Sequence, residues 1–100
     1  MQTFSWLPWK EAHNIRKHHV SFELAKHVFL DSDAHFRYEG IRSGEPRWLV
    51  LGKIDGGLVL AVACTVLKHG DHEEIQITAR RADKTERREY ETQRGEKHRS

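Results

Sequence analysis

The sequence has few of the residues that cross-link a protein or anchor it in a membrane. Of its 100 residues one is cysteine, Cys64, and two are proline. A single cysteine excludes an intramolecular disulfide and a metal site built from several cysteines. The longest uncharged apolar stretch, residues 58–67, is too short to span a bilayer. Residues 1–9 have no basic side chain and are interrupted by Pro8, which is unlike a signal peptide. We therefore expect no membrane association and a cytoplasmic location.

The net charge is also small, but it is unevenly distributed. The chain holds 17 Lys and Arg against 15 Asp and Glu, a formal charge of +2. Basic side chains are in excess in residues 10–27 and 80–100, and acidic ones in residues 28–79. The total excludes a polybasic arm and an acidic tail. The distribution predicts a local basic site if the two ends of the chain meet in the fold.

Apolar runs in the middle of the chain predict β-strands. The clearest runs are residues 47–54, 58–66 and 73–80. Between the first two stands Asp55-Gly56-Gly57, which is typical of a tight hairpin turn, and the third run alternates between apolar and polar positions. These runs predict a three-stranded antiparallel meander. A fourth strand near residues 35–39 is weakly indicated, and Phe4 and Trp6 suit a short edge strand.

The segments on either side of this sheet predict helices. They are residues 10–18, a segment that follows Ser21, and a segment that follows Asp83. Ser21 is a plausible N-cap, and Asp83 with Glu86 resembles a capping box for a helix that ends near Gly95. We expect one α+β domain over residues 1–92, with a small antiparallel sheet of three to four strands. Two N-terminal helices and one C-terminal helix pack on one sheet face, and residues 93–100 form a flexible tail.

The first predicted helix carries a polar stripe. Lys10, Asn14 and Lys17 are spaced to share one face, and His18 adjoins it. Such a stripe binds phosphate oxygens, and the histidine is available for proton transfer. A solvated helix face without function explains the same pattern.

Arginines at strand ends are the second candidate feature. Arg80 closes the strand at residues 73–80 on its polar face, whereas Arg81 points the other way, and Arg47 begins the first strand of the meander. An arginine on a polar sheet face beside a basic helix is a candidate phosphate clamp, because its planar fork matches two oxygens at once. Salt bridges of Arg80 to Glu73 or Glu74 are the structural alternative.

The last predicted helix brings Glu86 and Tyr90 onto one face, since they lie four residues apart. The capping box is a structural explanation for Glu86, and packing on the sheet is one for Tyr90. We expect neither a metal nor another cofactor. The pair His69 and His72 lacks a third ligand at a familiar spacing, and Cys64 lies in an apolar run and suits a buried, inert thiol.

In their order and spacing these residues resemble the BrnT family of small bacterial ribonuclease toxins. The matching N-terminal positions are Phe4, Trp6, Lys10, Asn14, Lys17, His18, Val20, Phe22 and Ala25, and the later ones are Arg47, Leu51-Gly52, residues 75–82, Glu86-Arg87 and Tyr90. Leu7 departs from the Asp of the family pattern and His19 from its Gly. Because glycine tolerates a positive φ better than histidine, the second departure affects the turn that positions Lys17 and His18.

The resemblance implies a RelE-like fold and metal-independent RNA cleavage. It also implies neutralisation by a cognate BrnA-like antitoxin, a ribbon-helix-helix protein that binds operator DNA, so that the toxin meets DNA only indirectly. RNA supplies its own nucleophile, the 2′-OH, and the enzyme supplies a base, an acid and cationic stabilisation of the transition state. The alternative is a catalytically weak binding module that acts mainly as a partner of the repressor. The departures from the family pattern at Leu7 and His19 support this alternative.

In the ribonuclease interpretation each candidate residue has a role. Arg80 is the main clamp on the transition state, supported by Arg47 and Lys17. The base is His18 or Glu86, and the second proton donor is His18 or Tyr90. The residues expected to bind RNA outside the reacting bond are Lys10, Asn14 and Arg81. An antitoxin that shields this basic face is expected to cover it with acidic and apolar side chains.

Overall fold

The fold comes from a computed structural model, which describes residues 2–99. Its helices and strands, in chain order, are β1 (Gln2–Phe4), α1 (Pro8–His18), α2 (Phe22–Ala25), the 3-10 helix η1 (Lys26–Leu30), β2 (His35–Arg42), β3 (Glu45–Lys53), β4 (Val59–His69), β5 (His72–Arg81) and α3 (Lys84–Lys97). The α+β class is confirmed. Within the described residues, no helix is long and apolar enough to cross a membrane.

The strands form a single mixed sheet in the order β1-β5-β4-β3-β2. The predicted meander is present as β3, β4 and β5, which pair antiparallel, and the predicted turn at residues 55–57 joins β3 to β4. The expectation of an antiparallel sheet of three to four strands is correct for the meander but wrong about the number of strands and about β1. The sheet has five strands, because β2 and β1 are both present and β1 pairs parallel to β5, with Thr3 opposite Glu74. Trp6 lies beyond the end of β1.

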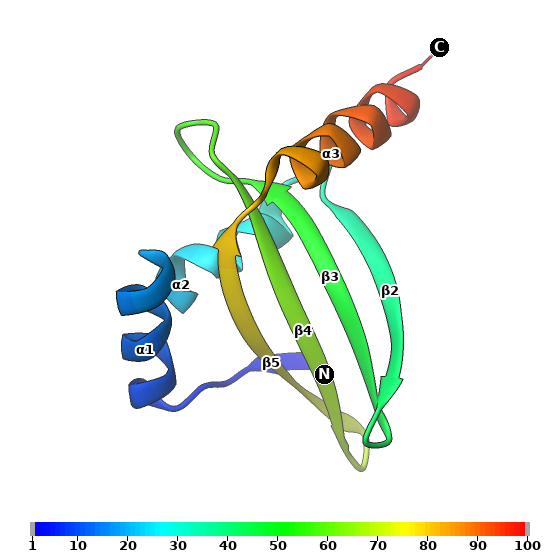
Figure 1. Ribbon diagram of the computed structural model, residues 1–100. Helices are drawn as coiled ribbons and strands as arrows, with labels where there is room; N and C mark the ends of the chain where they lie inside the picture. The colour runs from blue at the N-terminus through cyan, green and yellow to red at the C-terminus, as the bar shows by residue number, and fades with distance from the viewer. Residues whose placement is uncertain (1, 100) are drawn as a thin grey trace.

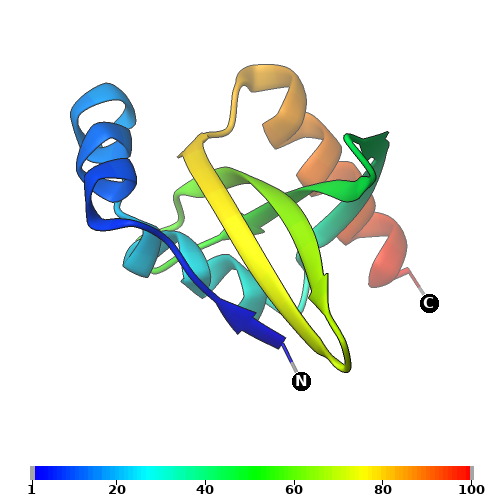
Figure 2. The same cartoon turned by 90° about the horizontal axis from the view of Figure 1, so that it is seen from below.

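Helices cover both faces of the sheet, so the expectation that they pack on one face is also wrong. Figure 2 shows α2 and η1 on one side of the sheet and α3 on the other. The core under α2 and η1 includes Phe22, Ala25, Val28, Val50, Leu60, Val62, Ile75 and Ile77. A second cluster under α3 consists of Leu49, Leu51, Val59, Ala61, Ala82 and Tyr90. Because Leu49 and Leu51 alternate with Val50, strand β3 is apolar on both faces and requires cover on both.

The close approach of η1 to the sheet depends on Gly52. A Cβ atom at Gly52 would lie 2.6 Å from the Cβ of Val28 in η1. No side chain fits there without moving η1, so the glycine fixes the distance between this helix and β3.

Further differences from the predicted elements concern β2, the second helix and α3. Strand β2 extends to Arg42 and contains a bulge between Tyr38 and Gly40, which interrupts the alternation and explains its weak signal. The second helix begins after Ser21, whose side chain accepts a hydrogen bond from the amide of Leu24, but it tightens into η1 after one turn. Helix α3 continues through Gly95 to Lys97, so residues 93–97 are helical.

Candidate active site

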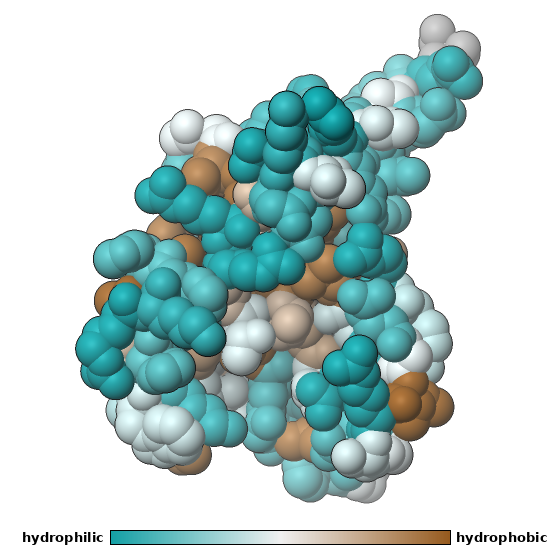
Figure 3. Space-filling model, in the orientation of Figure 1, coloured by the Kyte–Doolittle hydropathy of each residue, from teal (hydrophilic) through white to brown (hydrophobic). Residues whose placement is uncertain are grey.

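A groove lies on the part of the sheet that α3 leaves uncovered. Its volume is about 690 Å³. Its floor consists of Leu49, Ala63, Thr65, Gln76 and Thr78, from three neighbouring strands. One wall includes Leu7 and Lys10 at the start of α1, and the other includes Glu39, Arg42, Glu45 and Arg47 of the β2–β3 hairpin. Figure 3 shows this face, where hydrophilic side chains surround a paler floor. The floor is hollow because small side chains, Ala63 and Thr78, lie opposite each other at its centre.

Arg80 lies two residues beyond Thr78 on the same face of β5, about 7 Å along the strand from this edge of the groove floor, and is not itself one of the residues that line the groove. Its Nη1 donates to Oε1 of Glu86 at 2.6 Å, and its Nη2 donates to Oε2 at 2.8 Å. The alternative partners Glu73 and Glu74 are not the ones Arg80 uses. The Arg80 side chain is 42% exposed and that of Glu86 only 9%, so the carboxylate is the buried member and the guanidinium is accessible to solvent.

Glu86 also belongs to the predicted capping box, which is confirmed. Its Oε1 accepts from the amide of Asp83 at 2.9 Å, and its own amide donates to Oδ1 of Asp83 at 2.8 Å. The hydrogen bonds from Arg80, which outweigh burial, hold the pKa of Glu86 below its usual value, and the same bonds raise the pKa of Arg80. Glu86 is therefore negatively charged at neutral pH, and it fixes the direction of the Arg80 fork.

Asn14 is buried in the structure, and its amide is fully engaged. It is 5% exposed; its Nδ2 donates to the carbonyls of Val20 and Ala79, both at 2.8 Å, and its Oδ1 accepts from the amide of Ala79 at 3.3 Å. Strand β1 pairs with β5 only up to Ile75, so the outer edge of β5 at Ala79 has no neighbouring strand. Asn14 takes the place of such a strand and holds α1 against this edge.

The remaining polar residues of α1 lie on either side of Asn14. Helix α1 runs beside β5 in the same direction (Figure 1). Lys10, in the first turn of α1, lines the groove. Lys17 and His18 lie about 4.5 and 6 Å beyond Asn14 along the helix axis, in the direction in which β5 continues from Ala79 to its end. Their side chains make no hydrogen bond or ion pair within residues 2–99. Lys17 is exposed and His18 half-buried.

His19 adopts the conformation that a glycine would have. Its φ is 60° and its ψ 29°, in the left-handed region, and its amide donates to the carbonyl of Ile15 to end α1. The turn after Lys17 and His18 therefore has the backbone form that a glycine favours, although His19 stands in place of the family's glycine. The left-handed conformation of His19 costs conformational free energy.

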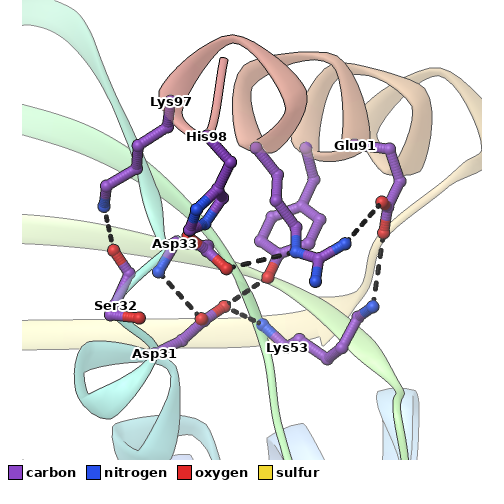
Figure 4. A network of polar contacts seen from close by, with 9 residues as sticks. Asp31, Ser32, Asp33, Lys53, Glu91, Lys97 and His98 are labelled. Carbon is purple, nitrogen blue, oxygen red and sulfur yellow. Dashed lines mark hydrogen bonds and ion pairs between the residues drawn. The ribbon is translucent and has the colours of Figure 1, made fainter. Parts of the chain in front are cut away.

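Tyr90 faces away from solvent and is hydrogen-bonded within the protein. It is 1% exposed, and its hydroxyl donates to Oδ2 of Asp31 at 2.6 Å. Burial and the bond to Asp31 raise the pKa of Tyr90. Oδ2 of Asp31 also accepts from the amide of Lys53, and Figure 4 shows this network, which continues through Asp33 to the end of α3. Sequence reasoning missed Asp31, since an isolated aspartate after a helix has no distinguishing pattern.

Arg47 and Arg81 have fewer contacts than Arg80. Nη2 of Arg47 lies 3.9 Å from Oε1 of Glu45, and its buried Nε has no hydrogen-bond partner within the described chain. Arg81 is exposed at the end of β5. Within residues 2–99, Arg80 and Glu86 are thus the only two predicted catalytic residues whose side chains contact each other directly.

The other candidate groups have structural partners. Cys64 is buried, and its burial raises the pKa of the thiol to about 12. His69 contacts Glu74, and His72 contacts Thr3. Between residues 2 and 99, no group of three or more His, Cys, Asp or Glu side chains is arranged to hold a metal ion.

The fold and the groove define a small α+β protein whose mixed sheet leaves one face partly open, with arginines and a lysine at its rim. The chain belongs to the BrnT family, the ribonuclease toxins of type II toxin–antitoxin systems, whose family model matches residues 6–86. This match confirms the family resemblance of the sequence and gives RNA as the substrate class and a protein antitoxin as the partner. A search of curated proteins returned no significant match.

Proposed function

We propose that this protein is an endoribonuclease that cleaves RNA in the groove without a metal ion, and that its fold is RelE-like. The observation that carries the proposal is Arg80, a solvent-accessible guanidinium that follows the groove residue Thr78 on the same face of β5 and is oriented by a buried carboxylate. Family membership supports toxin ribonuclease activity. The site and the mechanism are our inference.

In the proposed reaction Arg80 stabilises the charge that develops on the phosphate. The ribose 2′-oxygen attacks phosphorus, the bond to the 5′-oxygen breaks, and a 2′,3′-cyclic phosphate and a 5′-hydroxyl form. Glu86 takes one N–H from each Nη atom of Arg80, and Nη1 also donates to the carbonyl of Arg81 at 3.4 Å. The second N–H of Nη2 and the N–H of Nε are therefore the donors left for phosphate oxygens. Lys17 adds a second positive charge from α1. Cationic donors aimed at the developing charge make a metal ion unnecessary for this step.

The proton transfers are best assigned to His18. A base must take the proton from the 2′-OH, and an acid must protonate the leaving 5′-oxygen. Because its bonds to Arg80 lower the pKa of Glu86, that carboxylate is a weak base, and we assign it to positioning Arg80. The hydroxyl of Tyr90 donates a hydrogen bond to Asp31 and is buried, so we assign Tyr90 to holding α3 on the sheet. A single histidine serves both transfers by passing the proton from one oxygen to the other.

Residues outside the reacting bond bind the RNA backbone in this proposal. Lys10 at the groove wall and Arg81 at the end of β5 are exposed cations suited to phosphate contacts. Asn14 contributes indirectly, because its bonds to β5 hold α1, and with it Lys10, beside the groove.

The proposed partner is a BrnA-like ribbon-helix-helix antitoxin that contacts operator DNA itself. We expect one segment of it to fill the groove, with acidic side chains toward the rim and apolar ones toward Leu49 and Ala63. A complex that left the groove open would contradict this part of the proposal.

One observation favours the alternative, a binding module with little or no activity. Glu86 occupies both Nη atoms of Arg80, as a substrate phosphate would, and so competes with substrate for the strongest pair of donors. The two functions predict different behaviour of the purified protein toward RNA.

The test is incubation of the purified protein with RNA in excess EDTA, with and without the antitoxin. The enzyme is supported by cleavage that survives chelation, leaves 2′,3′-cyclic phosphate ends and stops on addition of the antitoxin. No cleavage with tight antitoxin binding supports the module. Cleavage that EDTA abolishes contradicts the metal-independent mechanism.

A further inference from the structure

Three polar side chains form a row across the groove floor at the end away from Arg80. Arg47 of β3 pairs in register with Thr65 of β4, and Thr65 pairs with Gln76 of β5. All three project from the open face of the sheet. Gln76 lies four residues before Arg80 on β5, which is about 13 Å along the strand. The row therefore lies in the groove on the same sheet face as the proposed clamp, but too far from Arg80 to contact the same phosphate closely.

Arg47 has hydrogen-bond donors that the protein leaves unused. Its Nε is buried without a partner in the described residues, and its nearest carboxylate oxygen, in Glu45, is 3.9 Å away. That distance is too long for a hydrogen bond. The buried Nε is out of reach of a ligand, but the Arg47 side chain is 38% exposed, and its Nη atoms are donors without a hydrogen-bond partner within residues 2–99 that a ligand with acceptors can use. Arg80 differs, because Glu86 already satisfies both of its Nη atoms.

Gln76 presents an acceptor on the opposite side of the row. Its Nε2 donates to Oε2 of Glu74 at 3.1 Å, and that carboxylate also accepts from Ser5 and His69. Hydrogen bonds from Ser5 and then Gln76 hold the pKa of Glu74 below its usual value. Since a carboxylate accepts only, the amide nitrogen of Gln76 faces Glu74 and its oxygen is left for a ligand.

The row thus offers donors at β3 and an acceptor at β5, two strands or about 10 Å apart. A guanine base fits this arrangement, because it has two acceptors, O6 and N7, beside two donors, N1–H and N2–H. Arginine bonded to O6 and N7 is the commonest specific contact between a side chain and a base. Adenine has an amino group in place of O6, and the pyrimidines have no N7. The apolar floor at Leu49 and Ala63 suits the flat face of a base.

We propose that Arg47, Thr65 and Gln76 form a subsite for one unpaired guanine near the cleaved bond, and that this subsite sets the sequence preference of the toxin. Arg47 donates to O6 and N7, Gln76 accepts from N1–H or N2–H, and the Thr65 hydroxyl lies between them. The proposal rests on the proposed RNA cleavage for its biological role, but base recognition itself requires no catalysis.

Binding of non-cleavable RNA therefore tests it separately from activity. Fluorescein-labelled 2′-fluoro pentanucleotides, which lack the nucleophile, carry G, A, C or U at the centre of four uracils. By fluorescence anisotropy we expect the unaltered protein to bind the guanine pentamer about tenfold more tightly than the others. Arg47→Lys keeps the charge but loses the fork, and Gln76→Ala loses the acceptor, so each reduces the preference to about twofold or less. Gln93→Ala, on the exposed side of α3, is the matched control and keeps the preference.

Three results overturn the subsite: equal affinity for all four pentamers, no binding to any of them, or a guanine preference that persists in both variants. Failure of the proposed function has a different signature, since unmodified RNA then stays intact in a parallel reaction whatever the anisotropy shows. Selective binding of guanine without cleavage of RNA would support the subsite and contradict the proposed ribonuclease function.

Discussion

The contact between Arg80 and Glu86 has a measurable energy, and the structure sets its size. Removing one member of a buried ion pair costs about 3–5 kcal/mol, whereas exposed pairs contribute less than about 1 kcal/mol. This pair lies between these limits, because Glu86 is 9% exposed but Arg80 is 42% exposed and screened by water. We therefore expect a coupling of about 1–2 kcal/mol, with two aligned hydrogen bonds between the charges. Arg80→Ala alone should lower the stability by about 2 kcal/mol.

A double-mutant cycle measures this coupling. The free energy of unfolding is determined by urea titration at pH 7, followed by tryptophan fluorescence, for the unaltered protein, Arg80→Ala, Glu86→Ala and the double variant. Glu86→Ala also removes the capping-box bond to Asp83, but this loss occurs in both backgrounds and cancels in the cycle. A coupling below about 0.5 kcal/mol would refute the reasoning.

The pH dependence of the coupling follows from the carboxylate. The pKa of Glu86 is lowered in the folded protein from its ordinary value of 4.5, so its contribution is fully present above pH 4.5. The contribution is lost as the pH falls through the lower pKa of the folded state. A coupling that increases below pH 4.5 would contradict this assignment.

Four further predictions concern the framework around the site. Asn14→Leu leaves backbone groups of Ala79 in β5 and of Val20 in the loop after α1 without partners and should cost about 3 kcal/mol in urea unfolding; a loss below about 1 kcal/mol would argue against its bridging role. His19→Gly should raise the stability by about 1 kcal/mol in thermal unfolding, because the left-handed conformation is relieved, and a decrease would contradict this. Tyr90→Phe removes the hydrogen bond to Asp31 and should lower the free energy of unfolding by about 2 kcal/mol, while the folded protein cleaves RNA at the unaltered rate. Loss of cleavage by the folded variant would instead indicate that Tyr90 is a proton donor in the reaction. Cys64 should react with a thiol reagent only after unfolding, and rapid labelling of the native protein would disprove its burial.

Local features of the fold could be predicted from the sequence, because they depend on neighbouring residues. The turn at residues 55–57, the cap at Ser21 and the capping box at Asp83 each satisfy backbone groups within four residues. Long-range features could not be predicted in this way. The parallel pairing of β1 with β5 joins residues about 70 positions apart, and a three-residue strand has almost no pattern of its own.

The positions of α3 and Asn14 show why the site was only partly predictable. Helix α3 has one buried apolar residue, Tyr90, so its own sequence does not say which sheet face it covers; the apolar pair Leu49 and Leu51 on β3 decides it. Asn14 stands in a polar stripe that is typical of a solvated face. Its burial depends on an unpaired strand edge at Ala79, which is a property of the assembled sheet.

RNA cleavage by Arg80→Ala, compared with Arg88→Ala, tests the central claim most directly. Arg88 is exposed on α3 and its side chain makes no hydrogen bond or ion pair within residues 2–99, so its removal takes away the same charge without touching the groove. Cleavage rates of both variants are measured in EDTA at a temperature where circular dichroism shows each to be folded. We predict a loss of at least about 100-fold for Arg80→Ala and a change within about twofold for Arg88→Ala. Folded Arg80→Ala protein that cleaves RNA at the unaltered rate would contradict the account.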